Sequence, residues 1–170
     1  MSKTAIQVTM KGNPVTLLGN DVEVGQLAPD ATLTANDLSE VKLSSFKGKK
    51  LLISVVPSLD TPICDQQTKR FNQEAAKLVD VQILTISMDL PFAQKRWCGA
   101  AGVDKLKTLS DHREASFAQA YGLLIKGPRL LARAIILVDT TGKIVYKQIV
   151  PEITTEPNYN DALETLKKVK

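Results

Sequence analysis

Two unbroken apolar runs, separated by a stretch with helical periodicity, constrain the fold of this chain more than any other feature. The runs are "LLISVVP" (51–57) and "VQILTIS" (81–87), and each is typical of a strand buried on both faces. Between them, apolar residues from Ile63 to Leu78 recur at helical spacing among Gln, Lys, Arg and Glu. The sequence therefore predicts a βαβ unit with a right-handed crossover, in which the helix covers residues 61–78.

Shorter elements are predicted on both sides of this unit. At the N-terminus, "AIQVTM" (5–10) and "VTLL" (15–18) flank the turn signal "KGNP", which predicts a β-hairpin extension over residues 1–19. The other expected elements are strands at 31–34, 41–43, 106–110, 132–139 and 143–150, and helices at 91–102, 113–122 and 158–168.

The order of these elements indicates an α/β fold. A βαβ unit is followed by short helices, then by two strands that "TTG" joins as a hairpin, and then by a terminal helix. We expect a central mixed sheet with helices on both faces, an arrangement that resembles a thioredoxin-like core. The sequence contains no internal repeat and no linker, so we expect residues 1–170 to form a single domain.

Composition and charge are those of an ordinary globular protein. Hydrophobic residues make up 44% and charged residues 24% of the 170 residues, enough for one sizeable core. The net charge of +4 forms no basic stripe interleaved with aromatic residues, which disfavours nucleic-acid binding. No segment approaches the roughly 20 apolar residues of a membrane-spanning helix, and no apolar run typical of a signal peptide follows Met1. We therefore expect no membrane contact and a cytoplasmic location.

The two cysteines, Cys64 and Cys98, are the candidate reactive groups, because cysteines in a reducing cytosol seldom form permanent disulfides. If Thr61 caps the predicted helix, Pro62 occupies the first helical position and Cys64 lies in the first turn. The unpaired backbone N–H groups and the positive end of the helix dipole favour a thiolate there, which is the nucleophilic form. The alternative is that Cys64 is a small, inert core residue at the helix start.

Other kinds of chemistry have weaker support in the residues. His112 is expected to face solvent, and a zinc site made of Cys64, Cys98 and His112 would lack the paired-cysteine spacing of structural zinc sites. The chain contains neither a G-x-x-x-x-G-K-[ST] phosphate loop nor a G-x-S-x-G motif. Asp60 and Asp65, which flank the cysteine, are expected to act as capping or dipole partners.

The segment "PSLDTPIC" (57–64) resembles the peroxiredoxin signature, in which a proline, three residues, a threonine or serine and two further residues precede the cysteine. The upstream segments "VGQLAPDATLT" and "LSSFKGKK" are also similar to that family. Three further stretches resemble the bacterial thiol peroxidase branch of atypical two-cysteine peroxiredoxins: "DTPICDQQTKRFNQEA", "RWCGAAG" and "EITTEPNY". The resemblance covers nearly the whole chain and implies a thioredoxin-like fold.

The resemblance implies a role for each residue of the motif. Cys64 would be the peroxidatic cysteine, whose thiolate attacks the O–O bond of a peroxide and becomes a sulfenic acid. Thr61 would supply a hydroxyl that contacts the sulfur and the peroxide, and Pro57 would shield the site from water. An arginine would stabilise the thiolate and the leaving oxygen. Arg133 lies where the family supplies it, and Arg129 is a second candidate nearby.

Cys98 would be the resolving cysteine, which forms an intramolecular disulfide with Cys64. The "GAAG" that follows it would let its helix shift or unwind. Because a disulfide needs Cα atoms within about 7 Å, we expect local unfolding around both cysteines during each cycle. The residues alone, without the resemblance, favour simple burial of Cys98 beside Trp97.

The resemblance also implies partners. These are hydrogen peroxide and organic hydroperoxides as substrates, thioredoxin as the reductant, a role in antioxidant defence, and a homodimer with its interface near the active-site end. No metal, haem or flavin cofactor is expected. The alternative is a thiol–disulfide oxidoreductase or a holdase-type binding module on the same fold. Such oxidoreductases carry a second cysteine three residues from the first, where this chain has Thr61 and Gln67.

Overall fold

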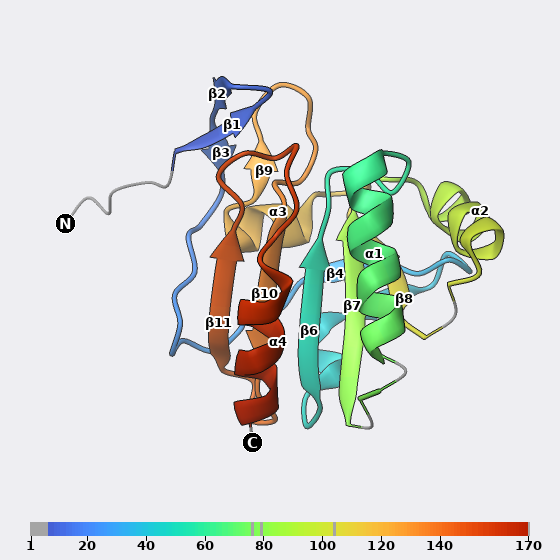
Figure 1. The fold of residues 1–170 in the computed structure, drawn as a ribbon, viewed down its shortest axis with the longest axis vertical. Helices are drawn as coiled ribbons and strands as arrows, with labels where there is room; N and C mark the ends of the chain where they lie inside the picture. Colours follow the sequence, from blue (N-terminus) through green and yellow to red (C-terminus); the bar gives the residue numbers. More distant parts are fainter. Residues whose placement is uncertain (1–6, 76, 79, 104, 170) are drawn as a thin grey trace.

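A single mixed sheet lies at the centre of the molecule (Figure 1). The computed structural model describes residues 7–75, 77–78, 80–103 and 105–169, and within them seven strands form this sheet. From one edge to the other the strands are β11 (Ile144–Ile149), β10 (Ala134–Val138), β6 (Lys50–Val55), β7 (Val81–Ser87), β8 (Lys107–Ser110), β4 (Thr32–Thr34) and β5 (Glu40–Lys42).

The strand directions confirm the predicted βαβ unit. β6, β7 and β8 are parallel, and α1 (Pro62–Ala75) connects β6 to β7. β10 is antiparallel to β6 and β11, whereas β4 is antiparallel to β8 and β5. α1 ends at Ala75, before the predicted Leu78, because the Lys77 backbone N–H donates to the Glu74 carbonyl 3.0 Å away in a tighter turn. The sequence pattern extended the helix too far because Leu78 still packs onto the core.

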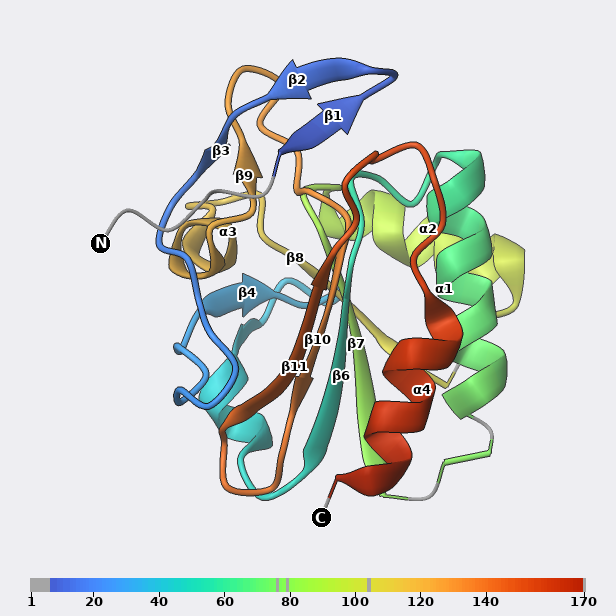
Figure 2. The ribbon, with the colours of Figure 1, turned by 60° about the vertical axis from the view of Figure 1, so that its left-hand side comes forward.

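Alternation along the strands builds one apolar core on each face of the sheet. Leu52, Ile83 and Ile135 point to the face covered by α1 and α4 (Tyr159–Lys168). Leu51, Ile53 and their equivalents on neighbouring strands point to the other face, where α3 (Ser116–Tyr121) and the 3₁₀-helix η1 (Leu43–Phe46) pack. Figure 2 shows α1 and α4 on one side of the sheet and α3 on the other. The predicted fold, a mixed sheet with helices on both faces, is confirmed.

The N-terminal segment contributes two small antiparallel pairings outside this sheet. β1 (Val8–Met10) pairs with β2 (Asn13–Val15), and β3 (Leu17–Leu18) pairs with β9 (Leu124–Ile125). A hairpin was expected, but a continuous second strand at 15–18 is wrong, because the chain leaves its partner after Val15. The turn holds Lys11 and Gly12 at φ +51° and +80°, the two positive values of a tight two-residue hairpin turn. Ala5 and Ile6 of the expected first strand lie outside the described residues.

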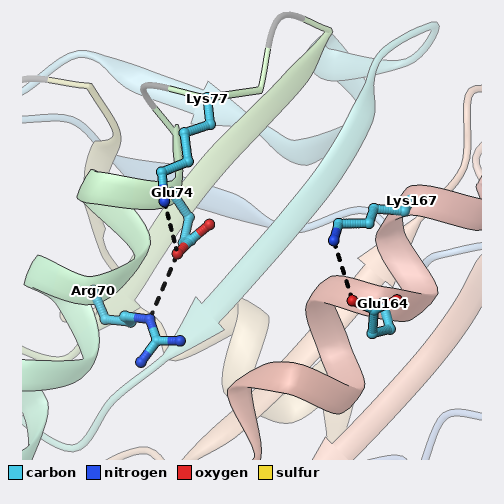
Figure 3. A network of polar contacts seen from close by, with 5 residues as sticks. All are labelled: Arg70, Glu74, Lys77, Glu164 and Lys167. Carbon is cyan, nitrogen blue, oxygen red and sulfur yellow. Dashed lines mark hydrogen bonds and ion pairs between the residues drawn. The ribbon is translucent and has the colours of Figure 1, made fainter.

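The ion pairs on the outer helical faces are solvent-exposed except at Glu74, whose side chain is 21% exposed. Figure 3 shows Glu74 between Arg70 and Lys77 on α1, with N···O distances of 3.6 and 3.7 Å, and Glu164 beside Lys167 on α4 at 3.1 Å. Pairs of this kind contribute about 0–1 kcal/mol each. The fold therefore depends on its two apolar cores. No helix in the described part of the chain is long and apolar enough to cross a membrane.

Candidate active site

Cys64 lies at the point where β6 passes into α1. The helix begins at Pro62, and the Asp65 backbone N–H donates to the Thr61 carbonyl at 2.9 Å, so Cys64 is in the first helical turn. Its side chain is fully buried in a small cluster with Val56 and Leu59, against which Trp97 packs. Unlike an ordinary core cysteine, it has a charged neighbour.

That neighbour is Arg133, the residue immediately before β10. Its guanidinium donates in three directions: Nη2 to Cys64 Sγ at 3.3 Å, Nη1 to Gln67 Oε1 at 2.8 Å, and Nε to the Ile153 carbonyl at 2.8 Å. β10 pairs with β6 so that Ala134 faces Val55, which brings Arg133 to the end of β6 where the loop to Cys64 begins. Three fixed acceptors hold the planar group in one orientation.

Arg133 is buried, with 2% of its surface exposed, and yet it has no carboxylate partner among the residues that the structure describes. No ion pair within the described ranges includes this arginine. Burying an unpaired charge costs several kcal/mol, so the native state favours a negative charge next to the guanidinium. Of its three partners, the two oxygens are neutral and only the Cys64 sulfur can ionise.

Gln67 and Ser54 complete the buried network, and sequence reasoning did not identify either. Gln67 Nε2 donates to Ser54 Oγ at 2.7 Å, while its Oε1 accepts from Arg133. Both side chains are fully buried. A signal was available for Gln67, since it lies three residues after Cys64 and therefore on the same face of α1. Thr68 adds a local bond, because its hydroxyl donates to the Cys64 carbonyl at 2.8 Å.

The loop before the helix carries the other two residues of the motif. Pro57 is buried. The exposed Thr61 donates its hydroxyl proton to the Ser58 carbonyl at 2.8 Å, and no hydrogen bond joins it to Cys64 within the described residues. Because its proton is committed, the Thr61 oxygen is left as an acceptor for a proton on an incoming molecule.

Asp89, two residues after the end of β7, holds this loop in place. The sequence analysis did not identify this residue. Its carboxylate accepts from Ser58 Oγ at 2.7 Å, from the Leu59 backbone N–H at 2.8 Å, and from Ser87 Oγ at 2.7 Å. The loop is thereby attached to the parallel strand next to β6.

The N-terminal hairpin supports Arg133 from the opposite side. The Thr9 backbone N–H donates to the Pro151 carbonyl at 2.7 Å and the Ile153 N–H donates to the Thr9 carbonyl at 2.9 Å. Glu152 accepts from the N–H groups of Lys11 and Gly12. Since the Ile153 carbonyl accepts from Arg133 Nε, the hairpin helps to position the guanidinium.

Cys98 is half-buried near the end of α2 (Pro91–Ala101), the helix beside the β8 edge of the parallel strands (Figure 1). Its sulfur lies 3.6 Å from Thr108 Oγ1, and it forms no disulfide with Cys64. Burial raises the pKa of the Cys98 thiol. The neighbouring Trp97 donates from Nε1 to Asp65 Oδ1 at 3.0 Å, which joins α2 to α1 beside Cys64.

The remaining candidates lie away from this cluster. Arg129 is exposed and has a φ of +56°, and its N–H donates to the Ile125 carbonyl at 3.1 Å. His112 is partly buried rather than fully solvent-facing, because its Nδ1 lies 3.0 Å from Ser110 Oγ. Asp65, expected as a helix-start partner, also forms an ion pair with Lys69 at 2.8 Å. No cluster of potential metal ligands occurs among the residues that the structure describes.

A cavity of about 180 Å³ lies at the opposite end of β6. It is lined mainly by apolar side chains, among them Leu51, Tyr121 and Val138. None of its lining residues belongs to the group around Cys64. The group of residues around Cys64 is therefore separate from this cavity.

A buried cysteine in the first turn of the helix that follows a central strand, bonded to a guanidinium, defines a thiol-based redox protein on a thioredoxin-like sheet. The chain belongs to the Redoxin family, which matches residues 23–163. It is 56% identical over 161 residues to "Thiol peroxidase" of Bacillus subtilis, covering 95% of this chain and 96% of that protein. "Thiol peroxidase" of Oceanobacillus iheyensis is 58% identical over 161 residues, with 95% and 98% covered.

Solved structures agree with this assignment. The crystal structure of a peroxiredoxin-like protein from Aquifex aeolicus superposes with a TM-score of 0.91 at 43% identity, covering 96% of this chain and 97% of that one. Thiol peroxidase from Chromobacterium violaceum has a TM-score of 0.87 at 20% identity, with 96% of both chains covered, and supports the fold alone. The expected resemblance to peroxiredoxins is confirmed.

Proposed function

We propose that this thiol-dependent peroxidase reduces hydrogen peroxide and organic hydroperoxides at Cys64. The observation that carries the proposal is the buried guanidinium of Arg133, bonded to Cys64 Sγ at 3.3 Å and without a carboxylate partner in the described part of the chain. A thiolate at Cys64 supplies the missing negative charge. The sulfur is thereby held in its nucleophilic form inside the protein.

The first step is a displacement at oxygen. The Cys64 thiolate attacks one peroxide oxygen, an S–O bond forms, and the O–O bond breaks. The other oxygen leaves with the electron pair, takes up a proton, and departs as water or an alcohol, while Cys64 becomes a sulfenic acid. Arg133 stabilises the charge that develops on the leaving oxygen, because its fixed N–H groups need no reorganisation.

Two further residues assist this step. Thr61 accepts a hydrogen bond from the peroxide, since its own proton is donated to the Ser58 carbonyl. The buried Pro57 limits water around the sulfur, which strengthens the electrostatic contribution of Arg133. The roles of Cys64, Thr61, Pro57 and Arg133 as catalytic residues are part of this proposal.

Cys98 completes the cycle as the resolving cysteine. It attacks the Cys64 sulfenic sulfur, forms a disulfide, and releases water. The contacts of Cys98 with Thr108 and of Trp97 with Asp65 must open first. Because Trp97 adjoins Cys98, its fluorescence is expected to change when the disulfide forms.

Reduced thioredoxin then opens the disulfide, and the cycle serves antioxidant defence in the cytoplasm.

We further propose a homodimer whose interface lies at the active-site end. Leu90 and Phe92, which are 54% and 65% exposed, support a contact surface there, because they adjoin Asp89, which holds the Cys64 loop. Residues 1–170 act as one domain in this proposal, since the N-terminal hairpin supports the arginine.

Thiol titration after one equivalent of hydrogen peroxide tests the proposal. Wild type should lose both thiols within seconds, and Cys64→Ser should retain its remaining thiol. Loss as slow as that of free cysteine would instead favour a binding module.

NADPH consumption with thioredoxin and its reductase tests the reductant. No turnover in that assay would exclude thioredoxin as the reductant while leaving the proposed peroxide step intact. Sedimentation of wild type against Phe92→Ser tests the dimer.

A further inference from the structure

The contacts of α2 divide the helix into a fixed half and a releasable half. Gln94 is fully buried and donates from Nε2 to Ser87 Oγ at 3.0 Å and to the Leu109 carbonyl at 2.9 Å. Beyond Gln94, one hydrogen bond from Trp97 and one contact of Cys98 are the polar attachments of the helix, Trp97 and Ala101 pack against the apolar core, and the helix ends at Ala101. Movement of Cys98 therefore depends on breaking few bonds.

The bond between Cys98 and Thr108 has a direction that the surrounding residues determine. The Thr108 hydroxyl donates its proton to Asn36 Oδ1 at 3.1 Å. A hydroxyl has only one proton, so Thr108 Oγ1 can act toward Cys98 only as an acceptor. The donor across the 3.6 Å contact is therefore the Cys98 S–H. A thiolate would have no proton for this bond.

Asn36 is presented by a turn with unusual backbone geometry. The turn joins β4 to β5, and Leu38 within it has φ +73°, a left-handed value that a leucine rarely adopts. Hydrogen bonds hold the turn closed, because Asp37 Oδ1 accepts from the Ser39 N–H and the Ala35 N–H donates to the Ser39 carbonyl. The strained turn keeps Asn36 next to β8.

Charged groups do not account for the state of Cys98. The elements around it carry Lys107 on β8, Asp37 in the turn, and Lys95 and Arg96 on α2. Lys107 lies over the Phe46 ring, Asp37 is bonded to Ser39, and Lys95 and Arg96 are exposed. None of the four forms a hydrogen bond or ion pair with the thiol in the described residues.

We propose that Asn36 and Thr108 form a latch that holds Cys98 as a neutral thiol on β8, and that opening this latch limits the rate of disulfide formation. The rate claim depends on the proposed role of Cys98 as resolving cysteine. To react, Cys98 must leave Thr108 and lose its proton. Its electron pair then forms the S–S bond, the S–O bond of the Cys64 sulfenic acid breaks, and the oxygen leaves with a proton as water. Asn36 and Thr108 are positioning residues in this scheme.

Substitutions at Asn36 test the direction of the bond. Asn36→Ala frees the Thr108 proton to donate to a Cys98 thiolate, whereas Asn36→Asp keeps an acceptor for Thr108 and adds a negative charge. In a Cys64→Ser background, the pH midpoint of Cys98 alkylation by iodoacetamide should fall in Asn36→Ala and rise in Asn36→Asp. Thr165→Val, which removes a hydroxyl bonded within α4, should leave the midpoint unchanged. An unchanged midpoint in Asn36→Ala would overturn the latch.

The rate claim is tested separately with Cys64 present. Disulfide formation after a pulse of hydrogen peroxide, followed by Trp97 fluorescence, should be roughly fivefold faster in Thr108→Val, which removes the hydrogen bond to Cys98. Thr108→Val should not lower the alkylation midpoint, because valine donates no bond to a thiolate. A shifted midpoint with an unchanged rate would overturn the claim that the latch is limiting. If mass spectrometry finds no disulfide in wild type, the resolving role fails, and the rate claim fails with it.

Discussion

The two cysteines occupy opposite kinds of surroundings. Cys64 is fully buried on a fixed helix start, and its sulfur accepts from a guanidinium that two further acceptors hold in place. Cys98 is half-buried on a helix end that few bonds attach, and its sulfur meets a neutral hydroxyl. Both sulfurs are at least partly shielded from water, but within the described residues Cys64 has a cation in hydrogen-bond contact and Cys98 has none.

This difference shows that burial does not by itself decide whether a cysteine reacts. At Cys64 the guanidinium of Arg133 donates to the sulfur and places a positive charge beside it. At Cys98 burial raises the pKa of the thiol, and no cation of the described residues contacts its sulfur. In the proposed cycle the first sulfur reacts where it lies, and the second must leave its position.

The largest expected effect on the rate of peroxide reduction comes from replacing the guanidinium of Arg133, which donates to three acceptors at once. Arg133→Lys keeps the charge, but a lysine cannot donate to Cys64, Gln67 and Ile153 at once. The rate of peroxide reduction should fall roughly 100-fold or more, as it does when a fixed donor to a developing oxyanion is lost. Stopped-flow measurement of the peroxide step gives this rate. The exposed Arg129→Lys is the matched control, and equal losses in the two variants would contradict the assignment.

The choice of the arginine beside Cys64 could not be predicted from the sequence pattern alone. The strand–helix–strand pattern and the helix-start position of Cys64 are local features, so periodicity and turn residues predicted them. The choice between Arg133 and Arg129 depends on the register between β10 and β6, which no local pattern contains. The structure brings Arg133 to Cys64 and leaves Arg129 in an exposed loop.

The residues that sequence reasoning missed act over long separations in the chain. Asp89 bonds a loop thirty residues earlier, as the contact with Leu59 shows. Glu152 reaches the N-terminal hairpin, 140 residues from Gly12. The pairing of β3 with β9 was missed for a related reason, since strands of two residues are too short to show a period.

Gln67 should give the next largest effect, because it orients the guanidinium without touching the sulfur. Gln67→Leu removes the acceptor for Arg133 and leaves Ser54 Oγ without its partner. The peroxide step should slow roughly tenfold, since a small displacement of a catalytic group is enough for such a loss. Gln67→Glu should also slow it, because a buried carboxylate would compete with the Cys64 thiolate for the cation. A normal rate in both variants would show that Ile153 alone positions the arginine.

A substitution at Trp97 tests how firmly the helix that carries Cys98 is held. Trp97→Phe keeps an aromatic ring in the apolar cluster but removes the bond to Asp65 that fastens α2 to α1. Disulfide formation should become about threefold to fivefold faster, the range for loss of one hydrogen bond, while the peroxide step should be unchanged. Quenching with an alkylating agent followed by mass spectrometry measures both steps without tryptophan fluorescence. The exposed Lys95→Gln on the same helix is the control. A slower disulfide step would mean that Trp97 guides Cys98 to its target.

The smallest effect is expected at Glu152, which supports the Cys64 site only through the hairpin and Ile153. Hydrogen bonds, led by that from the Thr154 hydroxyl, lower the pKa of Glu152 from 4.5 to about 2. A group with a lowered folded-state pKa stabilises the protein above its unfolded pKa, and this contribution is lost as the pH falls through the folded value. Wild type should therefore exceed Glu152→Gln in stability by a constant amount above about pH 5. The difference should shrink as the pH falls from 4.5 toward 2.

Urea unfolding at several pH values measures this difference in stability, with the exposed Glu164→Gln as control. Peroxide reduction at neutral pH should change less than about twofold, since Glu152 contacts neither Cys64 nor Arg133. A loss as large as that of Gln67→Leu would show that the hairpin, rather than the helix, determines the orientation of the guanidinium.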